Sequence, residues 1–237
     1  MTLDLARRLT AEALGTFFLV MAVIGSGIAA DNLAADEALV LLCNTLATAA
    51  ILVVIITIFV SVSGAQFNPA VTLVMLLRGE MEGGMALFYV ATQVAAASLG
   101  AVVADVMFGV APLQISDTAR NGFGQLLGEF IATFGLIATI LGSLRFRPGA
   151  LAAVVGLYIG SAYWFTSSTS FANPAVTIAR TLSHTYAGIQ PLDAPGFIVA
   201  QLLGAVAASY LFGWLFAEKA KRSRPQRAAS RSRPRAR

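Results

Sequence analysis

Two copies of one tripeptide hold the residues of this chain whose types and spacing suggest chemistry. The copies are Asn68-Pro69-Ala70 and Asn173-Pro174-Ala175, which stand 105 residues apart, and each opens a short apolar run. Asparagine is a favoured helix N-cap, and proline in the first turn loses no hydrogen bond that a helix needs. Residues 68–78 and 173–182 are therefore predicted to form two helices that begin at the asparagines and are too short to cross a bilayer.

The chemistry of such a pair depends on where the two helices begin. A helix N-terminus carries roughly half a positive charge, and half-helix dipoles at one point of a pore repel protons and other cations. The amides of Asn68 and Asn173 would offer hydrogen-bond donors at the same point. Water or a polyol can accept those bonds with its oxygen lone pairs. The pair therefore predicts a channel for neutral solutes.

The composition indicates that these helices lie in a membrane. Of the 237 residues, 57% are apolar and 12% are charged, whereas soluble domains carry about 25% charged residues. The mean hydropathy is +0.77. These values exclude an ordinary soluble enzyme, a disordered protein and a disulfide-stapled secreted module, and a single cysteine excludes a cysteine-based metal site. Six apolar stretches are long enough to span a bilayer, at about residues 10–30, 38–62, 84–108, 123–144, 150–168 and 195–217.

The two halves of the chain resemble each other beyond the tripeptides. Glu12 in the first span has a counterpart in Glu129 of the fourth, and Gln93 in the third has one in Gln201 of the sixth. Each half holds three spans, an odd number, so the second half must be inverted relative to the first. Inverted repeats place a functional site near the bilayer midplane, where interrupted helices meet. We expect a single channel domain over residues 1–217, with repeats at about 7–108 and 122–217.

Basic residues indicate the orientation. With a cytoplasmic N-terminus, fourteen of the sixteen Lys and Arg lie inside, and only Arg120 and Arg180 lie outside. Nine of the fourteen fall in residues 218–237, which we expect to be a disordered cytoplasmic tail that touches anionic lipid headgroups. The basic charge therefore reflects topology, and we expect no nucleic-acid partner.

On these motifs the chain resembles the aquaporin/glycerol-facilitator (major intrinsic protein) family over about residues 7–217. The resemblance implies an all-α fold of six transmembrane helices and two re-entrant half-helices. It also implies one pore in each protomer of a homotetramer, passive flux and no cofactor. Glu12 and Glu129 would be buried acceptors that hold the re-entrant backbone, and we expect Gln93 and Gln201 to make interhelical hydrogen bonds.

The departures from the family pattern bear on the substrate. Gln66 stands where a histidine is usual, and Val176 replaces the arginine that usually narrows the outer constriction. Arg180 lies one turn further on, about 6 Å along the axis, and is not expected simply to replace it. Counting from the two asparagines gives a filter of Thr48, Ser161, Ser170 and Val176, with no aromatic ring and no cation.

A wide, mildly polar filter predicts passage of solutes larger than water. Metalloid hydroxides such as arsenite, and glycerol-like polyols, would suit it, with water as a co-permeant. The segment NPAVTIAR also resembles a bacterial branch of the family associated with arsenic-resistance operons. This resemblance implies that the protein resides in a bacterial inner membrane. Tyr163, Trp164 and Phe165 are expected to form an interfacial belt, although part of this cluster could instead face the pore mouth and narrow it.

Two other functions are compatible with parts of this pattern. A water-selective aquaporin shares the motifs, and a secondary transporter shares the inverted repeats and broken helices. A transporter would need a charged coupling site at the midplane, and the intramembrane carboxylates lie outside the two tripeptide segments. No constellation of catalytic or metal-ligating residues gathers at one depth, so we expect neither an enzyme nor a metal site.

Overall fold

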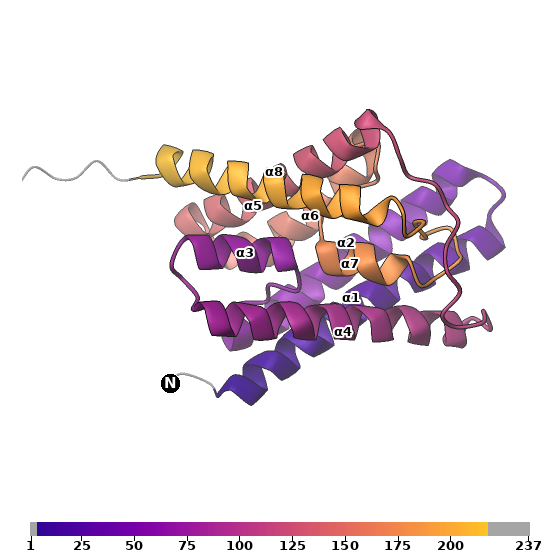
Figure 1. The fold of residues 1–237 in the computed structure, drawn as a ribbon, viewed down its shortest axis with the longest axis horizontal. Helices are drawn as coiled ribbons and strands as arrows, with labels where there is room; N and C mark the ends of the chain where they lie inside the picture. The colour runs from indigo at the N-terminus through magenta and orange to yellow at the C-terminus, as the bar shows by residue number, and fades with distance from the viewer. Residues whose placement is uncertain (1–3, 218–237) are drawn as a thin grey trace, which may run out of the picture.

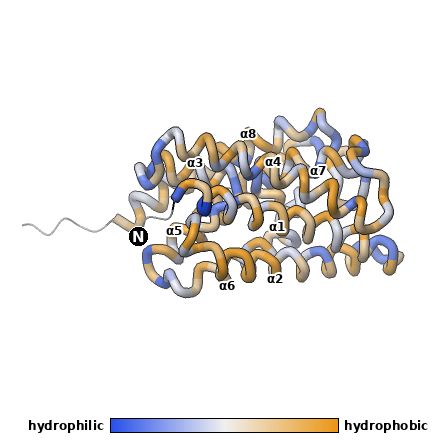
Figure 2. Tube along the Cα trace, turned by 90° about the horizontal axis from the view of Figure 1, so that it is seen from below, coloured by the Kyte–Doolittle hydropathy of each residue, from blue (hydrophilic) through white to orange (hydrophobic). Residues whose placement is uncertain are grey.

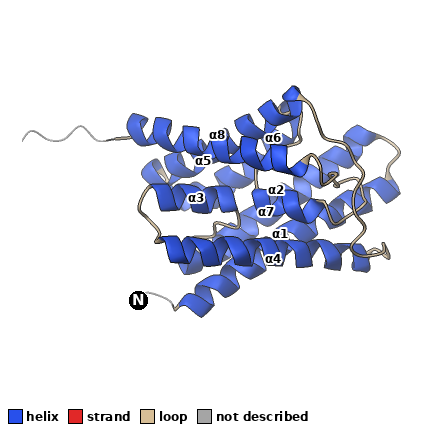
Figure 3. Ribbon diagram, viewed as in Figure 1, coloured by secondary structure: helices blue, strands red, loops and turns tan. Residues whose placement is uncertain are grey.

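The structure, a computed structural model, describes residues 4–217. Within that range the chain folds into α-helices and one 3-10 turn (Figure 1), with helices and loops as its only elements (Figure 3). The elements are α1 (Leu5–Leu33), α2 (Glu37–Ser63), α3 (Pro69–Leu77), α4 (Gly83–Met107), α5 (Phe123–Phe146), η1 (Pro148–Ala150), α6 (Leu151–Phe165), α7 (Pro174–Arg180) and α8 (Ala194–Leu215). The predicted tail at 218–237 lies outside the described residues.

Six of these helical segments are long and apolar enough to cross a membrane, which confirms the six predicted spans. They are α1, α2, α4, α5, α8 and the segment Pro148–Phe165, in which η1 leads into α6. The short helices α3 and α7 fall between spans two and three and between spans five and six. Figure 2 shows hydrophobic residues along most of the helical length, while the loops at both ends carry much of the hydrophilic character.

Local sequence signals set where the first helices begin and end. The side chain of Asp4 accepts a hydrogen bond from the Arg7 amide at 2.9 Å, and Asp36 accepts one from the Leu39 amide at 3.0 Å. Both aspartates therefore satisfy amides that the first turn leaves without an intrahelical partner. Gly64 ends α2 in the left-handed region, with φ of 90°.

The two halves are arranged as inverted repeats. In Figure 1, α1 begins and α8 ends at the same end of the bundle, α3 lies toward that end, and α7 lies toward the opposite one. The packing follows the same symmetry, because α1 packs on α4 in the first half as α5 packs on α8 in the second. The two short helices therefore enter the bundle from opposite ends.

Glycines allow the closest helix crossings. A β-carbon on Gly100 of α4 would lie 2.6 Å from the carbonyl oxygen of Phe17 in α1, and one on Gly204 of α8 would lie 2.4 Å from that of Phe130 in α5. No real side chain fits at those distances. The paired helices of each half therefore touch backbone to backbone, which brings the segments that precede α3 and α7 close enough to be held from both sides.

Candidate pore and selectivity filter

The two asparagines meet at the centre of the molecule and tie the halves together. Nδ2 of Asn68 donates to the carbonyl oxygen of Ala172 at 2.7 Å, and Nδ2 of Asn173 donates to that of Phe67 at 2.8 Å. The amide oxygens cap the short helices, because Asn68 accepts from the Ala70 amide at 2.8 Å and Asn173 accepts from the Ala175 amide at 3.0 Å. Each amide nitrogen has a second hydrogen, which remains for a solute.

A buried carboxylate holds the backbone before each short helix. Glu12 is fully buried and accepts from the Ser63 hydroxyl at 2.6 Å, the Gln66 amide at 2.9 Å and the Phe67 amide at 2.7 Å. Nε2 of Gln93 donates a fourth bond at 2.8 Å. These four hydrogen bonds replace the water that the carboxylate loses on burial, so the buried group remains satisfied.

The second half repeats this arrangement. Glu129, also fully buried, accepts from the amides of Phe171 and Ala172, both at 2.8 Å, and from Nε2 of Gln201 at 2.6 Å. The Ser168 hydroxyl is a further partner. We infer that both glutamates are structural acceptors rather than groups that carry protons.

The segments held by the glutamates share an unusual backbone. Ala65 and Phe67 have φ of 50°, and their counterparts 105 residues later, Ser170 and Ala172, have φ of 53° and 49°. Left-handed conformations cost roughly 1–3 kcal/mol each in residues other than glycine, and they persist only where the surroundings impose them. The repeated strain indicates that the path of these segments serves the site and is held by the carboxylate bonds.

A cavity of about 330 Å³ runs past both asparagines. Its lining extends from Glu80, beyond the C-terminal end of α3, to Arg180 at the C-terminal end of α7. Most of the lining is apolar, and the polar groups are few. The lining includes the apolar side chains Leu19, Val23, Leu52, Ile56, Val71, Leu136, Ile140, Val155 and Ile159, and the polar residues Thr48, Gln66, Asn68, Ser170 and Asn173.

Three of the four predicted filter residues lie in this lining, and Ser161 does not. Thr48, Ser170 and Val176 all line the cavity. Ser161 is exposed on the outside of α6, where its hydroxyl donates to the Leu157 carbonyl at 2.9 Å. In α6 the lining residues recur every four positions, at 151, 155, 159 and 163, so the count of twelve residues back from Asn173 reaches the opposite face of the helix.

Tyr163 takes the place in the lining that Ser161 was expected to fill. It is buried, and its hydroxyl lies 3.2 Å from Oγ1 of Thr48, to which it donates. The expectation that the filter has no aromatic ring is therefore wrong. So is the assignment of Tyr163 to an interfacial belt, whereas Trp164 and Phe165 are exposed as that interpretation expects.

Shortening Tyr163 is expected to widen the pore. In a Tyr163→Ala variant the ring and its bond to Thr48 are gone, so a four-carbon polyol such as erythritol should enter proteoliposomes several-fold faster than through the unmodified protein, in a stopped-flow swelling assay. Ser161→Ala should leave erythritol flux unchanged, because the Ser161 hydroxyl faces away from the cavity. Equal erythritol flux in Tyr163→Ala and the unmodified protein would contradict a narrowing role for the ring.

The outer end of the cavity carries a cation that the counting argument did not place there. Arg180 is 3% exposed and lines the cavity. Its guanidinium carbon lies 3.4 Å from the centre of the Phe171 ring, and its Nε donates to the Ala187 carbonyl. The four-residue spacing from Val176, which puts both side chains on one face of α7, was the signal that could have identified it.

Arg120, in the loop before α5, supports the same region. Its Nε donates to the Gly188 carbonyl at 2.8 Å, and its guanidinium carbon lies 5.2 Å from the centre of the Phe171 ring. Burial lowers the pKa of the Arg120 guanidinium and raises the pKa of the nearby Tyr186 phenol. Arg120 is not part of the cavity lining, so it contacts the wall behind the pore rather than the pore itself.

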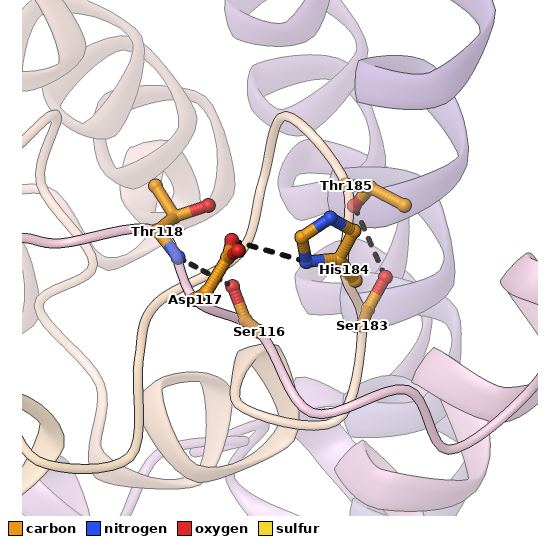
Figure 4. Close-up of polar contacts among 6 residues, drawn as sticks. All are labelled: Ser116, Asp117, Thr118, Ser183, His184 and Thr185. Atoms are coloured by element: carbon orange, nitrogen blue, oxygen red, sulfur yellow. Dashed lines mark hydrogen bonds and ion pairs between the residues drawn. The ribbon is translucent and has the colours of Figure 1, made fainter.

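Two loop segments, 116–118 and 183–185, lie beside each other, as Figure 4 shows. Nδ1 of His184 lies 3.1 Å from Oδ1 of Asp117, and the Ser183 hydroxyl lies 3.0 Å from that of Thr185. Both partners of the histidine pair are half-exposed or more. Within residues 4–217 no group of three or more His, Cys, Asp or Glu side chains could hold a metal ion.

Known proteins share this architecture. The major intrinsic protein family matches residues 1–171 and 144–233. The aquaglyceroporin AqpS of Rhizobium meliloti (strain 1021) is 55% identical over 212 residues, which cover 90% of this chain and 91% of that protein. A probable aquaporin, AqpM, of Archaeoglobus fulgidus is 30% identical over 92% of this chain and 100% of that protein.

A solved structure agrees with the fold. The X-ray structure of the aquaglyceroporin from Plasmodium falciparum has a TM-score of 0.64 at 22% identity, and the match covers 88% of this chain and 96% of that one. The inverted halves, the two asparagine-capped short helices and the family match over most of the chain lead to one conclusion. The chain belongs to the major intrinsic protein family, and it is an integral membrane channel for small neutral solutes rather than an enzyme.

Proposed function

We propose that this channel passes metalloid trihydroxides and glycerol-like polyols, with water as a co-permeant. The observation that supports it is the lining of the cavity, which combines a mostly apolar surface with a few hydroxyl and amide groups that include Ser170, Asn68 and Asn173. A polyol carries hydroxyls along an apolar carbon backbone, so both surfaces of such a lining can be matched at once. The relative AqpS is named an aquaglyceroporin.

The proposed filter consists of Thr48, Tyr163, Ser170 and Val176. The tyrosine makes it narrower than the sequence predicted, and Val176 keeps the wall beside the second tripeptide uncharged. The Tyr163 hydroxyl donates a hydrogen bond to Thr48. This bond lowers the number of polar groups that must lose water when a solute passes. We therefore propose that these four uncharged residues select solutes by size and by hydroxyl number.

A swelling assay over a panel of solutes tests the proposal. Proteoliposomes that hold the full chain should take up glycerol and arsenite faster than empty liposomes, with flux linear in concentration. Val176→Arg should reduce both fluxes by about tenfold, because a long cation placed beside Asn173 fills the filter, while water flux falls less. Val106→Arg, at an exposed site near the end of α4, is the matched control and should conduct normally.

Two outcomes would exclude the proposed substrates. Water flux without glycerol or arsenite flux would show a water-selective channel, and saturable flux coupled to an ion gradient would show a secondary transporter.

We propose further that the protein is a homotetramer in a bacterial inner membrane, with both termini in the cytoplasm. Exposed leucines on the outer surfaces of α2 and α6, among them Leu46 and Leu157, suit contact with lipid or with other protomers. Arg7 and Arg78 stand toward the end of the bundle where α1 begins, in agreement with a positive inner side. Cross-linking in native membranes and protease accessibility of the C-terminus test these two statements.

A further inference from the structure

We propose that Arg180 is the charge filter of this channel. It would exclude cations from a position one helical turn beyond the uncharged Val176. This inference rests on the proposed channel function. It concerns a residue that lies outside the tripeptide and that the counting from the two asparagines left out of the filter.

Arg180 lies in the wall of the cavity that forms the proposed solute path. It lines the same cavity as Val176, Ser170 and Tyr163, at the outer end of α7. The side chain is almost entirely buried in the protein. Four residues separate it from Val176, which corresponds to about 6 Å along the helix axis, so it forms a second level of the outer constriction.

The guanidinium is fixed against the wall of the pore. One face stacks on Phe171, with 3.4 Å between the guanidinium carbon and the ring centre, and the Nε–H is bonded to the Ala187 carbonyl. A guanidinium has five N–H donors, so this bond leaves the four on the terminal nitrogens for water or a solute hydroxyl. A side chain held in this way can present those donors to a solute in the cavity.

The charge at this level is positive and is not neutralised by a neighbour. Arg120 donates to the carbonyls of Gly188 and Tyr186, and its guanidinium carbon lies 5.2 Å from the same Phe171 ring. Three consecutive carbonyls are thus taken by the two guanidiniums. Among residues 4–217 neither arginine forms an ion pair with a carboxylate. A passing cation therefore meets the charge of Arg180, with that of Arg120 behind the cavity wall, before it reaches the dipoles of α3 and α7.

Arg180→Met tests this assignment, because methionine keeps an unbranched side chain and removes the charge. In proteoliposomes under a potassium diffusion potential, the variant should leak protons roughly tenfold faster or more, since one unit charge a few ångströms away strongly disfavours a passing cation. Glycerol flux should stay near that of the unmodified protein or rise. Arg7→Met, at an exposed arginine near the start of α1, is the matched control and should change neither rate.

Moving the positive charge from position 180 to position 176 distinguishes an electrostatic role of Arg180 from a structural one. If Arg180 acts as the pore cation, the double variant V176R/R180M should return the proton leak to the low rate of the unmodified protein. A purely structural role predicts the opposite pattern, in which glycerol flux is lost with no rise in leak and the second substitution restores nothing. That pattern would overturn the proposal.

If the Arg180 variants fail to fold, a substitution that leaves Arg180 intact provides the test. Val176→Arg keeps Arg180 in place, and it should leave the proton leak unchanged because the charge barrier is already present. A wild-type leak well above that of empty liposomes, lowered by Val176→Arg, would show that the wild-type pore has no such barrier. Absence of glycerol flux in the unmodified protein would instead contradict the proposed function, whatever the leak.

Discussion

Glu12→Ala is expected to prevent the first half of the channel from forming its pore segment. Four donors converge on this buried carboxylate, from Ser63, Gln66, Phe67 and Gln93. Each buried donor left without a partner costs about 1–3 kcal/mol, and the sum approaches the whole stability of a typical domain, about 5–15 kcal/mol. The left-handed backbone at Ala65 and Phe67 loses the bonds that impose it.

The measurement is the amount of monodisperse protein in detergent, followed by glycerol flux per reconstituted molecule. Glu12→Ala should yield little folded protein and little flux, whereas Glu12→Gln, which keeps one acceptor oxygen, should be intermediate. Glu37→Ala, at an exposed residue in the first turn of α2, should match the unmodified protein. Normal yield and flux in Glu12→Ala would show that other contacts hold the segment.

Gly100→Ala and Gly84→Ala are expected to change stability in opposite directions, although both substitutions are in α4. At Gly100 the new methyl group would lie 2.6 Å from the Phe17 carbonyl oxygen, and the backbone of α1 must move away to admit it. Overpacking of a core costs typically 1–3 kcal/mol, and here the obstacle is backbone rather than a flexible side chain. At Gly84 nothing lies within 4 Å, so alanine should add roughly 0.5–1 kcal/mol through its better helix propensity.

Thermal unfolding in detergent, followed by size-exclusion chromatography, measures both. Gly100→Ala should lower the midpoint by several degrees and reduce glycerol flux, because the α1–α4 contact positions Glu12 and Gln93 opposite each other. Gly84→Ala should raise the unfolding midpoint slightly above that of the unmodified protein. A Gly100→Ala variant as stable as Gly84→Ala would mean that the two helices can separate at no cost.

The sequence predicted the large features because each has a strong local signal. Six spans follow from apolar runs of sufficient length, and the two short helices follow from an asparagine cap before proline. The buried positions of Glu12, Glu129, Gln93 and Gln201 agree with the structural support expected of them. Their exact side-chain bonds depend on contacts between residues 21 to 81 positions apart.

The filter was harder to predict because its residues come from four separate segments. Counting back from Asn173 places Ser161 on the wrong face of α6, since the loop between α6 and α7 decides which face lies opposite the pore. Tyr163 and Arg180 stand out in the sequence for other reasons. No local sequence pattern shows that the tyrosine bonds to Thr48 or that the arginine stacks on Phe171. Those facts arise only when the halves are assembled.

The reciprocal bonds of the two asparagines have a consequence for how the channel is made. Asn68 needs the carbonyl of Ala172, and Asn173 needs that of Phe67, so each half supplies the acceptor that the other half lacks. Because synthesis runs from the N-terminus, Phe67 and Asn68 are made before Ala172 and Asn173. The central constriction therefore cannot form until the second half of the chain has been made. We therefore expect the central pair of bonds to form in one late step, when the two halves dock.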